Sequence, residues 1–138
     1  MAKLYYIAPV EFSCQESPVA VGTGKDFFQA DFAGEILGGA NDPCITGCIT
    51  DAGTGADGTD IQIRNVTQAR NYFPTASQFR VADKDTNGRA VLHKGTLSTQ
   101  PSFRAGDVLA LDVPALPGNS DSERLRVTLL CGFWREVS

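Results

Sequence analysis

The sequence has a single histidine among its 138 residues, and this scarcity limits the catalytic chemistry open to the protein. Histidine is the side chain whose ordinary pKa lies nearest to neutral pH, so a Ser-His-Asp or Cys-His arrangement would have to use His93. His93 follows Val91 and Leu92 in a segment with the composition of a β-strand, and no nucleophile motif accompanies it. Paired carboxylates of the glycosidase type cannot be recognised either, because each candidate lies in a polar turn or beside a basic residue. We therefore expect a protein that is not an enzyme.

Long apolar runs are also absent, since Gly, Asp, Asn or Arg interrupts each run well short of the roughly 20 residues of a membrane-spanning helix. The apolar stretch at residues 4–7 is too short for the hydrophobic region of a secretory signal. Twelve Lys and Arg residues stand against sixteen Asp and Glu residues, a net charge of -4 that disfavours binding to a phosphate backbone. Neither a membrane nor a nucleic acid is expected as a partner.

Cysteine is sparse, and four cysteines without a secretory signal fit buried thiols in a reducing cytosol better than a disulfide framework. Cys44 and Cys48 are spaced one residue wider than the common C-x-x-C pair, and zinc would need further ligands from Cys14, Cys131 and His93. Cys131 falls on the apolar face of a predicted strand and is expected in the core. No cofactor is predicted, and whether Cys44 and Cys48 are free, disulfide-bonded or metal-bound stays open.

Fourteen Gly and seven Pro residues punctuate the chain, and no stretch between them has the apolar period of a long amphipathic helix. Period-two alternation is strongest near the C-terminus, where every second residue from Leu125 to Phe133 is apolar. Asn87-Gly88 predicts a tight hairpin turn between two of the strands. We predict strands at residues 4–7, 27–32, 35–37, 45–50, 60–64, 78–82, 90–97, 108–113 and 125–133.

Short strands with turn signals between them predict an all-β fold, an antiparallel β-sandwich or jelly roll of about eight strands, with a closed barrel as the alternative. The length predicts one sandwich domain over residues 26–138. Residues 1–25 contain Pro9 and Pro18 and few alternating runs. They are either an ordinary first strand or an extended N-terminal arm that docks on a neighbouring chain by strand addition.

Two glycine-rich segments resemble nucleotide-binding motifs in their letters alone. Residues 53–58 match G-x-G-x-x-G, but a predicted strand follows where a dinucleotide site needs a helix, so a loop is expected. Residues 22–26 lack the leading Gly of a phosphate loop, and Asp26 replaces its Ser or Thr. The sequon Asn65-Val66-Thr67 is interpreted as the end of a strand.

Residues 83–88 match the first half of a calcium loop, with oxygen ligands at Asp83, Asp85 and Asn87 and the turn glycine at Gly88. The twelfth position, which should be a bidentate Glu, is Lys94. A plain Asn-Gly hairpin explains the same residues, and calcium binding stays open.

Several segments follow one another in a characteristic order: Gly34-Glu35-Ile36, Thr54-Gly55, residues 60–67, residues 103–113 and residues 125–129. This order, over residues 30–134, resembles that of small virion proteins of tailed bacteriophages. The resemblance is closest to the β-sandwich of capsid decoration (cement) proteins, and related sandwiches occur in neck, tail and fibre proteins.

That resemblance implies a non-enzymatic structural protein that decorates and stabilises the outer surface of the capsid shell. It implies synthesis in the bacterial host cytoplasm, a final place on the virion surface, contact with the major capsid protein, and a homo-oligomer such as a trimer. It brings no catalytic residues. The apolar and aromatic cluster Leu4, Tyr5, Tyr6 and Ile7 is the expected partner contact.

Two other functions remain as alternatives. One is a carbohydrate- or ligand-binding β-sandwich module, of a tail, neck or fibre, assisted by calcium at Asp83, Asp85 and Asn87. The other is a small hydrolase, which would need His93 in a cleft beside a nucleophile. A decoration protein needs a large apolar contact surface, whereas a lectin-like module displays exposed aromatic side chains and calcium-dependent binding.

Overall fold

A computed structural model describes residues 2–16, 19–39, 42–43, 45–50, 59–73, 80–84, 90–93, 101–115 and 123–137. The regular elements in these ranges are β-strands, and no helix occurs among them, so the predicted all-β class is confirmed. None of the described segments forms a helix of the length and apolarity needed to cross a membrane.

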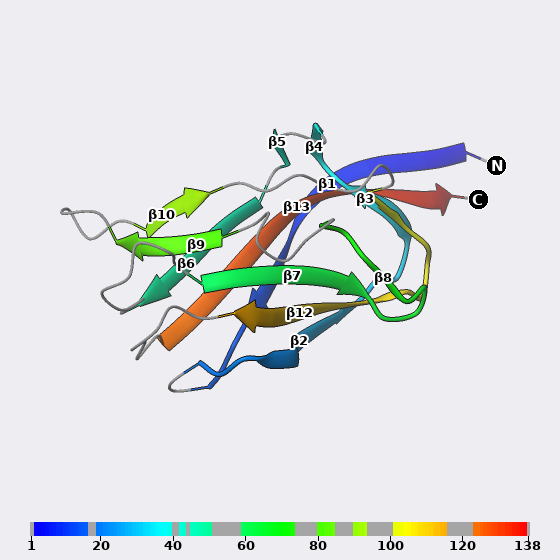
Figure 1. The fold of residues 1–138 in the computed structure, drawn as a ribbon. Helices are drawn as coiled ribbons and strands as arrows, with labels where there is room; N and C mark the ends of the chain where they lie inside the picture. The colour runs from blue at the N-terminus through cyan, green and yellow to red at the C-terminus, as the bar shows by residue number, and fades with distance from the viewer. Residues whose placement is uncertain are drawn as a thin grey trace.

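The first sheet is organised around β13 (Glu123–Val137), the longest strand in the described part of the chain. β1 (Ala2–Ser13) pairs with β13 along its whole length, from Ala2 opposite Val137 to Ser13 opposite Arg126. On its other side β13 pairs with β6 (Ile45–Thr50) over its first half and with β3 (Ala33–Ile36) over its second half. β11 (Ser102–Phe103) continues the sheet beyond β3. Figure 1 shows β1 and β13 side by side, with both chain ends at the same end of the molecule.

The second sheet faces the first, and its pairings are also antiparallel. Its strands in spatial order are β10 (Ala90–His93), β9 (Arg80–Lys84), β7 (Thr59–Asn65), β12 (Val108–Ala115) and β2 (Gly22–Gln29), with β8 (Arg70–Asn71) on the end of β7. β4 (Gly38–Gly39) and β5 (Asp42–Pro43) form a separate short ladder. No strand pairing joins the two main sheets within the described residues, so the antiparallel sandwich is confirmed over the closed barrel.

The core lies between the two sheets and follows the predicted alternation. In β13 the inward side chains are Leu125, Val127, Leu129, Cys131 and Phe133, all of them buried. They meet buried residues of the opposite sheet, among them Ile61, Ile63, Leu109, Leu111 and Val113. Full burial of such a side chain contributes about 1.5–3 kcal/mol relative to leaving it exposed, so this layer is a main source of the fold's stability.

A buried polar cluster closes one end of the sandwich, where β7 ends and β12 begins. Asp107 Oδ2 accepts hydrogen bonds from the backbone N–H of Arg104 (2.8 Å), from Asn65 Nδ2 (2.9 Å) and from Gln68 Nε2 (2.6 Å). Burial raises the pKa of Asp107, but these hydrogen bonds to the ionised form lower it by more, so the pKa lies below its ordinary value. Asn65 is fully buried and ends β7, which confirms the strand-end interpretation and leaves no room for a glycan.

Several local predictions can be compared with the strands. β9 and β10 pair as a hairpin, as predicted, while the Asn87-Gly88 turn lies outside the described residues. The G-x-G-x-x-G segment at 53–58 also lies outside them, and β7 follows it as a strand. Residues 22–26 belong to β2, where Lys25 Nζ lies 2.6 Å from Glu16 Oε1. Residues 1–25 contain the whole of β1 and the start of β2.

Candidate functional site

β1 presents two different surfaces, because successive side chains of a strand point to opposite faces of its sheet. Val10 and Phe12 are buried in the core, so the even positions of β1 face inward and the odd positions face outward. The predicted partner contact is therefore divided. The odd residues Tyr5 and Ile7 are 42% and 59% exposed, whereas Tyr6 packs against the core. Leu4 has the parity of Tyr6 but is 53% exposed.

The outward side chains of β1 meet those of β13 to form a surface that we term the apolar face, consisting of Tyr5, Ile7, Leu130 and Trp134. The register places Tyr5 opposite Trp134, and their ring centroids are 5.1 Å apart at an interplanar angle of 47°. Leu130 and Trp134 are 37% and 38% exposed, although each has a large apolar side chain. Adjoining exposed apolar side chains of this kind mark an interaction surface more often than scattered ones do.

Gly132 shapes the apolar face by having no side chain. It lies opposite Ile7, one step along the outer face from Trp134. A Cβ atom at this position would overlap the hydroxyl and ring carbons of Tyr5. The absence of that atom lets the Tyr5 ring lie over the backbone of β13 at Gly132.

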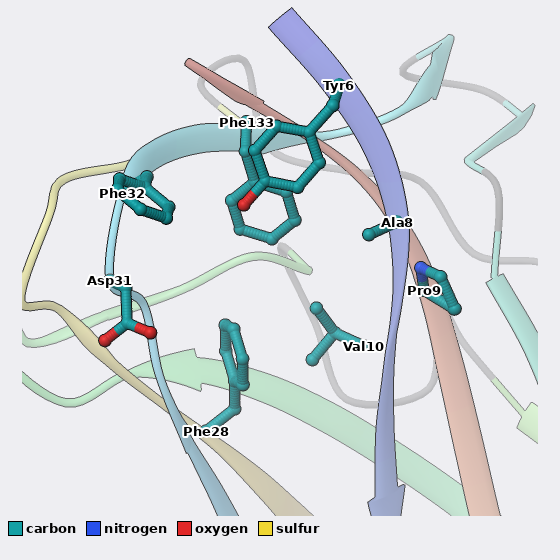
Figure 2. Close-up of a pocket in the computed structure, with 8 residues that line it drawn as sticks. All are labelled: Tyr6, Ala8, Pro9, Val10, Phe28, Asp31, Phe32 and Phe133. Carbon is teal, nitrogen blue, oxygen red and sulfur yellow. The ribbon is translucent and has the colours of Figure 1, made fainter. Parts of the chain in front are cut away.

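The inward side of β1 borders a pocket of about 190 Å³. Four aromatic rings, from Tyr6, Phe28, Phe32 and Phe133, surround it (Figure 2). Tyr6 stacks on Phe133 with centroids 5.3 Å apart, and Phe32 meets Tyr6 edge-on at 6.3 Å. The remaining lining residues are Ala8, Pro9, Val10 and Asp31.

One carboxylate and one guanidinium lie beside the rings of this aromatic pocket. Asp31 supplies the carboxylate among its lining residues and is exposed. The guanidinium of Arg135 lies 5.5 Å from the centroid of the Phe32 ring, a cation–π distance. The pocket is smaller than the roughly 300–1,000 Å³ typical of drug-sized ligands, so it would hold one ring or one side chain.

The cysteines with described side chains, Cys14 and Cys131, are free and buried. Burial raises the pKa of the Cys131 thiol to about 12 and also raises that of Cys14. Both thiols are therefore poor nucleophiles at neutral pH. Cys44 lies outside the described residues, and Cys48 belongs to β6.

The candidate calcium ligands can be placed in part. Asp83 belongs to β9, while Asp85 and Asn87 lie outside the described residues. His93 is the last residue of β10. Among the residues that the structure describes, no three or more His, Cys, Asp or Glu side chains gather at one point.

A comparison with protein-family models, curated proteins and solved structures found no match to this chain. Its function has therefore to be inferred from the apolar face and the aromatic pocket. Sequence reasoning identified Tyr5 and Ile7 but missed Leu130 and Trp134. The alternation from Leu125 to Phe133 already implies that Leu130 faces outward, and continuing it by one residue places Trp134 on the same face.

Proposed function

We propose that this protein is a non-enzymatic structural protein that binds the surface of a larger protein assembly through the apolar face. The proposal rests on one observation: the exposed side chains of Tyr5, Ile7, Leu130 and Trp134 adjoin one another on the outer side of the first sheet. A solvent-facing sheet normally alternates apolar-in with polar-out, and β1 and β13 depart from that rule on their outer side. Aromatic side chains of this kind dominate the binding energy of protein interfaces.

The assembly that we propose is the capsid shell of a tailed bacteriophage, with the major capsid protein as partner and the virion surface as location. The order of segments over residues 30–134, which resembles that of capsid decoration proteins, supports this choice. An antiparallel sandwich whose two sheets share a continuous core also supports it, because such a body resists deformation when a shell is under stress.

The proposal is tested by sedimenting the purified protein with empty capsid shells of its source phage. We expect Leu130→Lys and Trp134→Ala to weaken shell binding tenfold or more, because each removes apolar contact from the centre of the apolar face. Phe27→Lys is the matched control, since Phe27 is 58% exposed but lies on the outer side of the other sheet, opposite Ala110. Wild-type protein that stays in the supernatant would contradict the proposal.

A second candidate function is a ligand-binding module, which the aromatic pocket favours. Phe32→Ala removes one wall of the pocket without touching the apolar face. If saccharides bind the wild type in calorimetric titrations and Phe32→Ala abolishes that binding while Leu130→Lys retains it, the pocket is the functional site. If Phe32→Ala still binds capsid shells and Leu130→Lys does not, the structural function is favoured.

A further inference from the structure

β1 is an edge strand. It pairs with β13 on one side, and none of the described strands pairs with its other side. The strand is 12 residues long and carries exposed apolar side chains at Tyr5 and Ile7. A long exposed strand edge is a template for pairing with a further strand.

The hydrogen bonds around β1 show which backbone groups point outward from this edge. The N–H of Cys14 donates to the carbonyl of Leu125 at 2.9 Å, and the β1–β13 register makes these two residues opposite neighbours. In an antiparallel ladder such bonded pairs alternate with unbonded ones, so the even residues of β1 bond to β13 and the odd ones point away. Ser13 agrees with this assignment, because its N–H donates to Asp26 Oδ2 instead, at 2.7 Å.

Pro9 has an odd number and therefore lies where a missing N–H costs β1 no bond to β13. Tyr5 and Ile7 are also odd. Their backbone N–H and C=O groups have no partner within the described part of the chain. From Lys3 to Glu11, the outward edge is thus a row of backbone N–H and C=O groups that lacks only the N–H of Pro9.

We propose that two copies of this chain pair through their β1 edges, antiparallel, about a twofold axis that passes beside Ile7. In this register Ile7 lies opposite Ile7 of the second copy, and Tyr5 lies opposite Pro9 of the second copy. Lys3 then lies opposite Glu11 of the second copy, and the same pairs recur on the other side of the axis. This interface is isologous and closes on itself as a dimer.

Charge complementarity indicates that the strand pairing with the β1 edge belongs to a second copy of the chain. It also favours this register over others. Lys3 and Glu11 near the two ends of the edge would disfavour an arbitrary apolar strand, which is how natural edges are protected. Against a second copy in this register each charge meets its opposite. Shifting the register by two residues places Lys3 opposite Pro9 and leaves neither Lys3 nor Glu11 opposite a charged residue of the second copy. Glu11 Oε1 lies 3.5 Å from Arg126 Nε, but both side chains are more than half exposed. This contact therefore leaves Glu11 able to pair with Lys3 of the second copy.

The dimer would also make the apolar face continuous. Tyr5 and Ile7 lie on the outer side of the first sheet, so pairing across the twofold axis brings the faces of both copies onto one sheet. The dimer goes beyond the proposed function, because it does not require a capsid shell.

Light scattering on a size-exclusion column tests the dimer with the full chain. We expect the wild type to elute at twice the chain mass. Ile7→Pro should halve that mass, because it removes the central N–H donor of the edge but no bond to β13. Ile7→Val is the matched control and should keep the doubled mass. A monomeric wild type, a trimer, or a dimeric Ile7→Pro that retains the wild-type circular dichroism spectrum would each overturn the proposal.

A charge reversal gives a second readout that does not depend on proline. Glu11→Lys alone should weaken dimerisation tenfold or more, and the double variant Lys3→Glu, Glu11→Lys should restore it. If the double variant does not recover the dimerisation of the wild type, the result would argue against the proposed register. Shell sedimentation of Glu11→Lys and of Leu130→Lys separates this proposal from the proposed function, since Glu11 is on the β1 edge but outside the apolar face, and Leu130 is in the apolar face but not on the β1 edge.

Discussion

At the scale of single residues, Asp107 connects segments that are far apart in the sequence. Its side chain accepts hydrogen bonds from Asn65 at the end of β7 and from Gln68 in the following turn. Its backbone carbonyl accepts the N–H of Ala30, the residue that follows β2, at 2.8 Å. A carboxylate with several donors loses little by being buried, because each donor favours the ionised form.

Replacing this carboxylate should destabilise the protein in a way that depends on pH. We expect Asp107→Asn to lower the free energy of unfolding by about 1–3 kcal/mol at neutral pH, since a neutral amide oxygen accepts the three hydrogen bonds more weakly than the ionised carboxylate does. The pKa of Asp107 lies below its ordinary value of 3.8 in the folded chain, so its contribution is complete above that value. The contribution disappears as the pH falls through the lower pKa of the folded state.

Urea denaturation of the two proteins at about pH 7 and about pH 3 measures this dependence. The wild type should lose more stability than Asp107→Asn on acidification, so the two unfolding midpoints should approach each other. A difference between them that is as large at low pH as at neutral pH would show that the ionised carboxylate does not contribute.

At the scale of elements, β13 has leucines on both of its faces, one face buried and the other exposed. Leu129 is fully buried in the core, and its neighbour Leu130 belongs to the apolar face. We expect Leu129→Ala to cost about 2–5 kcal/mol of unfolding free energy, through lost burial and the cavity left behind. Leu130→Ala should change it by about 0.5 kcal/mol or less, because an exposed side chain loses few contacts. Thermal unfolding of both variants checks the difference, and equal losses would mean that the face assignment is wrong.

The strands with clear alternation were predicted best from the sequence. β6 has the predicted bounds 45–50, and the predictions at 60–64, 108–113 and 125–133 fall within β7, β12 and β13. β1 was predicted only at residues 4–7, because consecutive apolar residues and Pro9 conceal its period of two. The two-residue strands β8 and β11 carry no period at all, and pairing with β7 and β3 defines them.

The site was predicted less completely than the fold. Tyr5 and Ile7 stand out in sequence as an apolar cluster, but Trp134 joins them only through the register of β1 and β13. Tyr6 was grouped with the outward residues because the sequence does not reveal which parity faces the core. The aromatic pocket brings Phe28 and Phe133 together from opposite ends of the chain, and only tertiary packing can do that.

At the scale of the whole molecule, the role of residues 1–25 can be tested by removing β1. Deleting residues 2–13 should abolish cooperative unfolding, because the buried side chains of Val10 and Phe12 leave the core and β13 loses its partner on one side from Arg126 to Val137. If residues 1–25 were instead an arm that docks on a neighbouring chain, the deletion would leave the stability of the sandwich unchanged. A truncated protein with the wild-type unfolding midpoint, measured by circular dichroism, would therefore favour the arm.

The pairing of β1 with β13 also affects how the protein is made. During translation β1 leaves the ribosome long before β13, and the first sheet lacks its organising strand until residues up to Val137 have emerged. Contacts between such distant segments close slowly and leave apolar strand edges open in the meantime. The first sheet can therefore form only after β13 has emerged, and until then the nascent chain exposes unpaired apolar strands for longer than a protein built from local hairpins would.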